Sequence, residues 1–339
     1  MENEILSLFE KCFGRTVTKV EALPASGSAR KYFRVWQEEH SYIAACHRNI
    51  QENRLFIRFT EHFRRKGLHV PEVYGVSEDG AVYIQEDLGD KMLLDVVEES
   101  RKSEELDERV MGLYRKALKE LLRFQLLGGE GLDYSDCLPR PVFDSRCIRW
   151  DLNYFKYCFL RLAGVDVSEQ ALEDDFEKLT ALLCRVDTHS FMFRDFQSRN
   201  IMVRGDEVWF IDYQGGRQGA LPYDVASLLY DAITRIPDRQ REELLDDYIR
   251  ELQGFRGFRK AEAAEFRAMY YPFVLIRLLQ AMGAFGLRGL YEGKPHFIDS
   301  IVPGLENILS LFVPEKLAGE YPEIERVCRV ALEKEKNGK

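Results

Sequence analysis

The sequence lacks the cysteine and histidine patterns of disulfide-rich and zinc-binding proteins. Its seven cysteines are scattered and never spaced as CxxC, and its six histidines form no ligand cluster. This distribution is typical of reduced thiols in a cytosolic protein, and it argues against a disulfide framework or a zinc centre.

Neither a signal peptide nor a membrane-spanning segment is expected from the sequence. The residues Met1-Glu2-Asn3-Glu4 have neither the basic start nor the apolar stretch of a signal peptide. The longest apolar run, 270–287, is interrupted by Arg277 and Gln280 and is too broken to span a bilayer. We therefore expect a cytoplasmic protein with no membrane partner.

Positive charge is in deficit as well. Acidic residues outnumber basic ones 57 to 48, which gives a formal charge of −9. Because nucleic acids attract positive surfaces, no nucleic-acid partner is expected. The hydrophobic fraction of 45% is ordinary for a globular protein, and 339 residues suffice for two lobes.

The first hundred residues have the pattern of a small α+β unit. A short amphipathic helix at 3–13 precedes strand-like runs, and one further helix interrupts them. The expected strands are 17–23, 31–37, 41–45, 70–74 and 81–85, with the second helix at 52–66 between the third and fourth strands.

From residue 95 onward the pattern is mostly helical. Apolar residues recur at helical spacing in 110–127, for example, and this segment ends at Gly128-Gly129. The sequence thus predicts an α+β fold in which a small antiparallel β-lobe with a helix sits on a larger helical lobe. We place the boundary between residues 88 and 89, so the lobes are 1–88 and 89–339.

One loop and hairpin in the second lobe carries the polar residues of greatest interest. Asp195 and Asn200 are separated by four residues, and apolar strands at 201–204 and 208–211 then lead to Asp212. Because a hairpin holds its two ends together, Asn200 and Asp212 are expected to face one point. Phosphoryl transfer needs such a set: a carboxylate that accepts the proton of the attacking hydroxyl, and oxygen ligands for Mg²⁺. Taken singly, the same residues are also common in turns.

This pattern resembles the aminoglycoside phosphotransferase/choline kinase family, whose fold is protein-kinase-like and whose signature is H-x-D-x4-N followed by a metal-binding Asp. The resemblance implies that Asp195 is the catalytic base and that Asn200 and Asp212 bind magnesium. Phe193 stands where the family has histidine, which predicts altered loop packing rather than lost activity. Asp224, in Pro222-Tyr223-Asp224, matches the family's Asp that braces the catalytic loop.

The likeness is greatest to the bacterial kinases that phosphorylate the anomeric hydroxyl of the cell-wall amino sugars N-acetylmuramate and N-acetylglucosamine. Matching pieces follow one another along residues 17–310, among them 26–34, 52–57, 70–73, 86–89, 122–125 and 293–295. The resemblance implies an Mg²⁺-dependent sugar kinase with ATP as its co-substrate.

The nucleotide site implied by the resemblance lies on the first lobe. The turn Ser26-Gly27-Ser28 would cradle phosphate oxygens through its amides and hydroxyls. The third strand lacks the lysine that kinase-like folds usually carry, and either Arg30 or Lys31 is predicted to replace it; both could also be solvated edge-strand charges. The main chain of Glu86 and Leu88, in the hinge, would bind the adenine edge.

The acceptor site implied by the resemblance lies on a helix around residues 149–155. Asp151 matches the acidic position of the family's substrate-facing helix, and Arg149 belongs to the same segment. The aromatic residues Trp150, Tyr154 and Tyr157 lie at helical spacing, which favours the core over a sugar platform.

Two other functions remain open from the sequence. An aminoglycoside kinase would need carboxylates to hold a polycation, whereas the segment around Asp151 is basic. A nucleotide-binding pseudokinase, or partner-binding module, would explain the missing lysine and Phe193. Such a module has no need to keep Asp195, Asn200 and Asp212 together.

Overall fold

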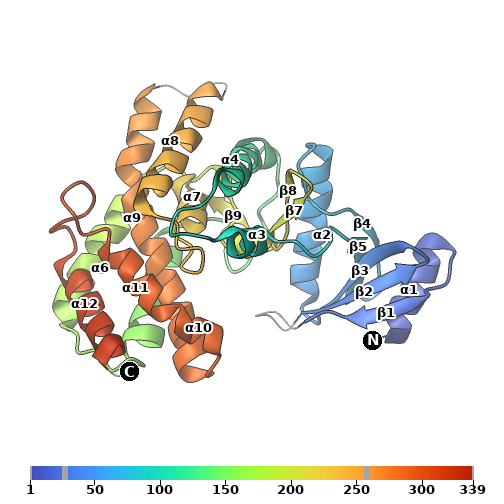
Figure 1. Cartoon of the computed structure of the whole chain (residues 1–339), viewed down its shortest axis with the longest axis horizontal. Coiled ribbons are helices and arrows are strands. Elements are labelled where there is room, and N and C mark those ends of the chain that lie inside the picture. Colours follow the sequence, from blue (N-terminus) through green and yellow to red (C-terminus); the bar gives the residue numbers. More distant parts are fainter. Residues whose placement is uncertain (1, 25–29, 256–259, 338–339) are drawn as a thin grey trace.

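The computed structural model describes residues 2–24, 30–255 and 260–337. A small sheet lobe lies at one end of the elongated molecule, and helices make up the rest (Figure 1). The sheet is antiparallel, with strand order β1-β2-β3-β5-β4. Its strands are β1 (Lys19–Ala22), β2 (Lys31–Gln37), β3 (His40–Cys46), β4 (Val73–Val76) and β5 (Val82–Glu86).

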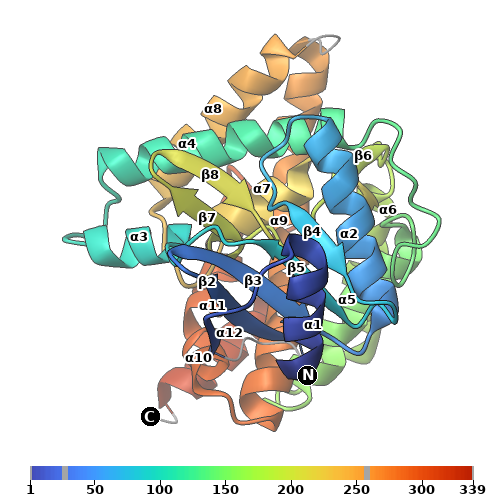
Figure 2. The ribbon, with the colours of Figure 1, turned by 90° about the vertical axis from the view of Figure 1, so that its right-hand side faces the viewer.

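Two helices cover the two faces of this sheet. Helix α1 (Glu2–Phe13) buries Phe9 against one face, where Ala44 and Ile84 form a small core. Helix α2 (Ile50–Arg65) lies on the other face, where Ala45 and Tyr83 belong to the main core. The alternation of neighbouring residues between the faces is the period-2 pattern that a strand requires. Figure 2 views the sheet end on, with α1 in front of it.

Helix α2 packs against both lobes. Phe56 stacks on Tyr83 of β5 at 5.2 Å and on Tyr213 of the large lobe at 4.9 Å between ring centroids. Phe59 and Phe63 contact Phe191 at 5.9 and 5.0 Å. The hydrophobic core therefore continues through α2 across the proposed boundary at residues 88 and 89.

The large lobe is mainly helical. Its helices are α3 (Leu93–Ser100), α4 (Glu108–Arg123), α5 (Ser145–Phe155), α6 (Glu169–Leu183), α7 (Pro222–Leu229), α8 (Asp238–Gly254), α9 (Lys260–Phe285), α10 (Pro295–Asp299), α11 (Ile301–Leu309) and α12 (Pro322–Asn337). Two short strand pairs join them: β6 (Ser190–Met192) with β9 (Arg217–Gly219), and β7 (Ile201–Arg204) with β8 (Glu207–Phe210).

The segment Ala263–Tyr291 is long and apolar enough to cross a membrane by length and composition, yet 61% of its most apolar window is buried inside the protein. It is therefore a core helix of the large lobe. A glycine lets it approach α5 closely, because a Cβ atom on Gly283 would lie 2.8 Å from the carbonyl carbon of Tyr154. The middle of α9 lies beside the loop that follows β6, because Nη2 of Arg277 is 3.8 Å from Oδ1 of Asp195.

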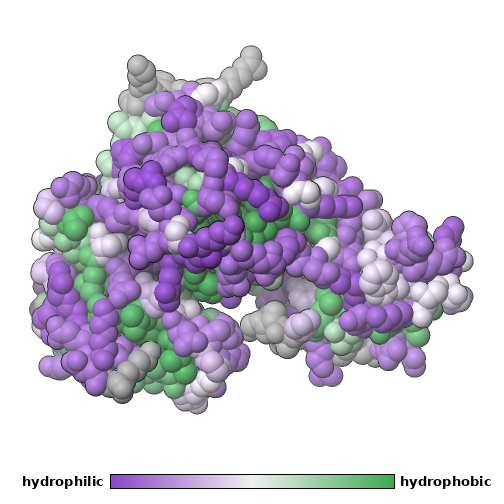
Figure 3. Space-filling view, viewed as in Figure 1, coloured by the Kyte–Doolittle hydropathy of each residue, from purple (hydrophilic) through white to green (hydrophobic). Residues whose placement is uncertain are grey.

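The space-filling view shows the surface hollowed between the sheet lobe and the helices at the lower edge of the large lobe (Figure 3). The segment 193–200, which carries Asp195, joins β6 to β7 on the large lobe. Since β7 also makes backbone contact with Lys91, just after the sheet, this segment lies close to the junction of the lobes.

Candidate active site

The structure brings Asp195, Asn200 and Asp212 together. Pairing of Ile201 with Phe210 closes the hairpin, and the Ile211 N–H donates to the Asn200 carbonyl at 3.1 Å. The amide of Asn200 donates to the main-chain carbonyl of Asp195 at 2.8 Å, and its Nδ2 lies 3.5 Å from Oδ2 of Asp212. The side chains of Asn200 and Asp212 therefore meet at one end of a small β-ribbon, with the main chain of Asp195 beside them.

The donor set fits a magnesium ion held partly by nucleotide phosphates. Because Nδ2 of Asn200 is used toward Asp195, its Oδ1 is left as a ligand. Asp212 has φ 65°, a conformation that non-glycine residues adopt rarely, and Gln214 donates to its Oδ1 at 2.7 Å. Within the described residues no cluster of three His, Cys, Asp or Glu side chains suits a metal. Mg²⁺ needs only one or two carboxylates when phosphates and water complete its shell.

The electrostatics around Asp212 also favour a cation. Burial raises the pKa of Asp212, and the neighbouring carboxylate of Asp195 adds to this effect. The hydrogen bond from Gln214 and the positive charges of Arg30 and Arg199 act in the opposite direction. A divalent ion at this point would remove the repulsion between the two carboxylates.

The side chain of Asp195 is open to solvent, as a group that meets a substrate must be. It is 52% exposed, and its Oδ1 lies 3.8 Å from Nη2 of Arg277 on α9. Two hydrogen bonds fix the main chain of Asp195, because its carbonyl accepts from the side-chain amide of Asn200 and from the Gln197 N–H.

Asp224, at the start of α7, is buried beneath this loop. Its Oδ2 accepts from the Phe193 N–H at 2.7 Å, and its Oδ1 accepts from the Arg194 N–H at 2.9 Å. Burial raises the pKa of Asp224 to about 7, although these hydrogen bonds and Gln125 counteract the effect. The geometry is that of a brace on the backbone just before Asp195.

A second carboxylate holds the other side of the same loop. Ser198, which is buried, donates its hydroxyl to Oδ2 of Asp231 at 2.8 Å. Asp231 follows α7 and was not singled out by the sequence. Because its partner is 33 residues away, no local pattern could have identified it.

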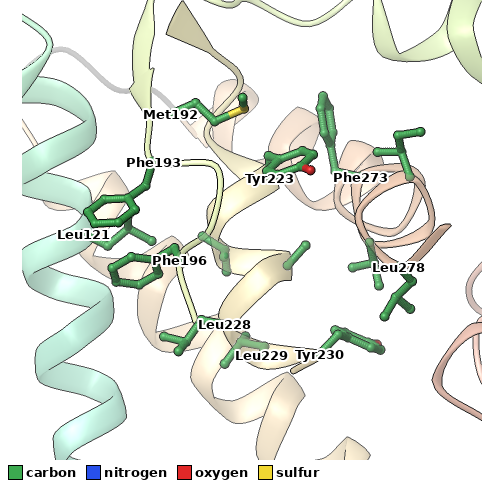
Figure 4. Close-up of a cluster of buried hydrophobic side chains, with 14 of the residues drawn as sticks. Leu121, Met192, Phe193, Phe196, Tyr223, Leu228, Leu229, Tyr230, Phe273 and Leu278 are labelled. Carbon is green, nitrogen blue, oxygen red and sulfur yellow. The ribbon is translucent and has the colours of Figure 1, made fainter. Parts of the chain in front are cut away.

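Phe193 occupies an aromatic cluster rather than a hydrogen-bonding position. Its ring lies 5.2 Å from Phe196 and 6.0 Å from both Phe210 and Tyr213. Figure 4 shows Phe193 and Phe196 pointing toward Leu121 of α4, away from α7. The Phe193 side chain is thus held by apolar packing and not by the hydrogen bonds that a histidine could form. Asp224 holds the backbone of the loop in place.

Arg194 connects this loop to α5. Its guanidinium donates to both carboxylate oxygens of Asp151, at 2.7 and 2.6 Å, and to the Tyr223 hydroxyl at 2.7 Å. Burial alone would lower the pKa of Arg194, but the carboxylate of Asp151 outweighs it and raises the pKa well above the ordinary value. Arg194 has φ 83°, so this pair also holds a strained backbone next to Asp195.

This pairing changes how Asp151 is interpreted. The sequence predicts that Asp151 binds the acceptor, but its side chain is 8% exposed and both oxygens are engaged by Arg194. We therefore propose that Asp151 positions the loop. The signal that sequence reasoning missed is the arginine directly before Asp195.

Arg149 lies in a different environment from Asp195. It forms an ion pair with Glu173 of α6, and Lys156 binds the same carboxylate at 3.0 Å. The basic character of this segment is thus largely neutralised by α6, and it gives no information about the charge of the acceptor. Within the described residues the structure records no contact between Arg149 and Asp195, Asn200 or Asp212.

The aromatic residues of α5 and of the helical turn that follows it, Lys156–Leu160, are not all in the core, contrary to expectation. Trp150 and Tyr157 are 44% and 56% exposed, whereas the buried face of the helix carries Ile148, Leu152 and Phe155. The spacing correctly places these aromatic residues along one side of the helix. The rest of the large lobe, however, packs against a different side, which carries Ile148, Leu152 and Phe155.

On the sheet lobe, the structure distinguishes Arg30 from Lys31. The Arg30 side chain is 3% exposed and lies 3.4 Å from Glu52 of α2, and its charge acts on Asp212 across the lobes. Lys31 is exposed. A strand cation paired with a helix glutamate is the arrangement that kinases use to hold nucleotide phosphates. Ser26, Gly27 and Ser28 lie outside the described residues.

The hinge residues occupy the expected place at the end of β5. The Glu86 N–H donates to the Glu72 carbonyl at 2.7 Å, and the Glu86 side chain binds Arg204 at 2.7 Å. The Leu88 N–H makes no hydrogen bond within the described part of the chain. The Leu88 N–H is thus a group that an adenine edge could use.

Comparison with known proteins agrees with this geometry. A sequence model described as the phosphotransferase enzyme family matches residues 19–261. The N-acetylmuramate/N-acetylglucosamine kinase of Pseudomonas putida is 25% identical over 288 residues, which cover 83% of this chain and 79% of that protein. The kinase of the same name from Pseudomonas aeruginosa is 27% identical over 239 residues, covering 68% and 66%.

A solved structure shows the fold independently. The ethanolamine kinase of Plasmodium vivax superposes with a TM-score of 0.58 at 15% identity, over 91% of this chain and 86% of that one. The predicted two-lobed, protein-kinase-like fold is thereby confirmed. The family match and the kinase relatives also confirm a phosphotransferase whose acceptor is a hydroxyl group. Since the family model spans most of its length, the chain belongs to the phosphotransferase enzyme family.

Proposed function

We propose that the protein is a cytoplasmic kinase that transfers the γ-phosphate of ATP to the anomeric hydroxyl of an N-acetylated amino sugar. The observation that carries the kinase chemistry is the convergence of Asp195, Asn200 and Asp212 at the junction of the lobes. The two Pseudomonas kinases, whose printed names specify N-acetylmuramate and N-acetylglucosamine, support the choice of acceptor.

Asn200 and Asp212 would hold Mg²⁺, which when bound neutralises charge on the nucleotide phosphates. The exposed carboxylate of Asp195 would accept a hydrogen bond from the acceptor hydroxyl and take its proton as the new bond forms. Arg30, anchored by Glu52, would place positive charge beside the phosphates. Because the transition state of phosphoryl transfer is loose, orientation and charge contribute more than the strength of the base.

The test is a transfer assay with a blocked acceptor as its control. Purified protein, ATP and Mg²⁺ are incubated with N-acetylglucosamine or N-acetylmuramate, and products are detected by mass spectrometry. Phosphorus–hydrogen coupling in NMR spectra locates the phosphate on the sugar. The methyl glycoside, whose anomeric oxygen is capped, should yield no product.

Other outcomes would select the alternatives. Phosphorylation of kanamycin but of neither sugar would show an aminoglycoside kinase. Thermal stabilisation by Mg²⁺–ATP without transfer to any acceptor, and without ATP hydrolysis, would indicate a nucleotide-binding module.

A further inference from the structure

Arg277 is a buried cation placed directly beside the proposed base. It lies on α9 and is 4% exposed, yet its Nη2 is 3.8 Å from Oδ1 of Asp195, whose side chain is half-exposed. Figure 4 shows α7 between the catalytic loop and α9. Arg277 of α9 contacts both Ser227 of α7 and Asp195 of the loop. None of the chemistry described so far uses this guanidinium.

The orientation of Arg277 is fixed by neutral partners. Its Nε donates to the Ser227 hydroxyl at 2.9 Å, and its Nη1 donates to Oε1 of Gln280 at 2.7 Å. Gln197, from the loop, lines the same narrow hollow as Arg277 and Ser227. Ser227 and Gln280 carry no charge and so do not cancel the positive charge of Arg277, which acts on the buried carboxylate of Asp224 and on Asp195.

The separation between Arg277 and Asp195 suits a shared ligand better than a direct ion pair. A charge-assisted N–H···O bond is about 2.7–2.9 Å long, and 3.8 Å exceeds that. An oxygen atom about 2.8 Å from each group closes a triangle on a 3.8 Å base. An acceptor hydroxyl that donates its hydrogen to Asp195 can therefore receive an N–H from Arg277 on its lone pair.

We propose that Arg277 is a catalytic residue that binds the reacting hydroxyl oxygen of the acceptor. This inference rests on the proposed function, and it adds the group that stabilises charge on the attacking oxygen. In the transfer step the acceptor oxygen bonds to the γ-phosphorus of ATP, and the bond from phosphorus to the β,γ-bridging oxygen breaks. Its electron pair leaves on ADP, and the hydroxyl proton passes to Asp195.

An anomeric hydroxyl suits this arrangement well. The ring oxygen next to the anomeric carbon withdraws electrons, so this hydroxyl is more acidic than an ordinary alcohol and gives up its proton more readily. A fixed guanidinium stabilises the negative charge that develops on the attacking oxygen without reorganising, which is the effect of a preorganised donor.

The first experiment compares Arg277→Gln with the wild-type enzyme. We expect kcat/KM for N-acetylglucosamine to fall about 10²- to 10³-fold, as on removal of one such donor, while the KM for ATP stays within a factor of about three. Arg241→Gln is the matched control, because Arg241 is also buried, at 5% exposure, and binds Asn307 through Nη2. It should lower the melting temperature and leave kcat/KM unchanged.

The second experiment tests contact with the reacting oxygen itself. Binding of N-acetylglucosamine and of its 1-deoxy analogue is measured by calorimetry in the presence of ADP and Mg²⁺. The wild type should prefer the hydroxyl-bearing sugar by about tenfold, the size of one hydrogen bond to a charged group. In Arg277→Gln this preference should disappear while affinity for the deoxy sugar is retained.

Each outcome decides the matter. Equal loss of affinity for both sugars, or unchanged kcat/KM, overturns the assignment of Arg277. If Arg277→Gln fails to fold, Arg277→Lys serves instead, because its shorter amine keeps the charge but cannot reach the attacking oxygen; wild-type behaviour of that variant also overturns the assignment. If the wild-type enzyme forms no sugar phosphate, the proposed function fails and the assignment fails with it.

Discussion

The ion pair between Asp151 and Arg194 gives a prediction that separates a positioning role from substrate binding. The variant Asp151→Asn keeps the shape of the side chain but leaves the buried guanidinium of Arg194 without its carboxylate. Breaking a buried pair by removing one partner costs about 3–5 kcal/mol. Since both side chains are less than 15% exposed, solvent screens this pair little, and we expect most of that loss.

The magnitude can be checked by urea denaturation, in which the unfolding free energy of Asp151→Asn is compared with that of the wild type. Arg149→Gln is the matched control, because its pair with Glu173 is about one-third exposed on both sides and should contribute about 0–1 kcal/mol. The double variant Asp151→Leu/Arg194→Leu should lose much less than the sum of its single variants, because no unpaired charge remains.

The same variant has a kinetic consequence. Arg194 precedes Asp195 and has φ 83°, so loss of its anchor should misplace the base and lower kcat more than it raises the KM of the acceptor. If Asp151→Asn unfolds at the wild-type urea concentration and only the acceptor KM rises, the positioning role is refuted and Asp151 binds the acceptor.

Three further predictions follow from the same geometry. Arg30→Ala should raise the KM for ATP about tenfold, whereas Lys31→Ala, at an exposed position, should not; equal effects would refute the distinction, which steady-state kinetics can test. Asp195→Asn should lower kcat by orders of magnitude while ADP still binds in a thermal-shift assay, and an active variant would exclude Asp195 as the base. Burial raises the pKa of Asp224 to about 7 in the folded state, so the folded protein binds its proton more tightly than the unfolded chain does. The stability of the wild type relative to Asp224→Asn should therefore fall as pH rises from about 4 to 7 and level off above, in denaturation curves at each pH; a pH-independent difference would contradict the shift.

Local patterns predicted the elements whose signal lies within one segment. The strand expected at 31–37 is β2 with the same bounds, and the hairpin at 201–204 and 208–211 is found within one residue. The pair β6–β9 was missed because each strand has only three residues and its partner lies far along the chain, 29 residues away for Ser190 and Gly219. The charged C-terminal segment forms α12, which buries Ile324 and Val327 against α6 and α11.

For the candidate site, the sequence identified side chains but not their partners. Asp195, Asn200 and Asp212 could be found because a loop and one hairpin bring them together within 18 residues. The pairs Arg30–Glu52 and Asp151–Arg194 join residues 22 and 43 apart, and only the packing of the lobes and helices sets them. Asp151 was therefore assigned to the acceptor, because the sequence does not show that a buried arginine faces it.

The aromatic side chains of α2 determine which parts of this enzyme can move. Phe56, Phe59 and Phe63 pack the helix against Tyr213 and Phe191 of the large lobe. The helix therefore cannot swing outward as a regulatory element without opening the main core. Opening and closing of the nucleotide site is left to the five strands, which would pivot over a stationary helix. Activity in such an enzyme would be controlled by substrate supply and not by displacement of that helix.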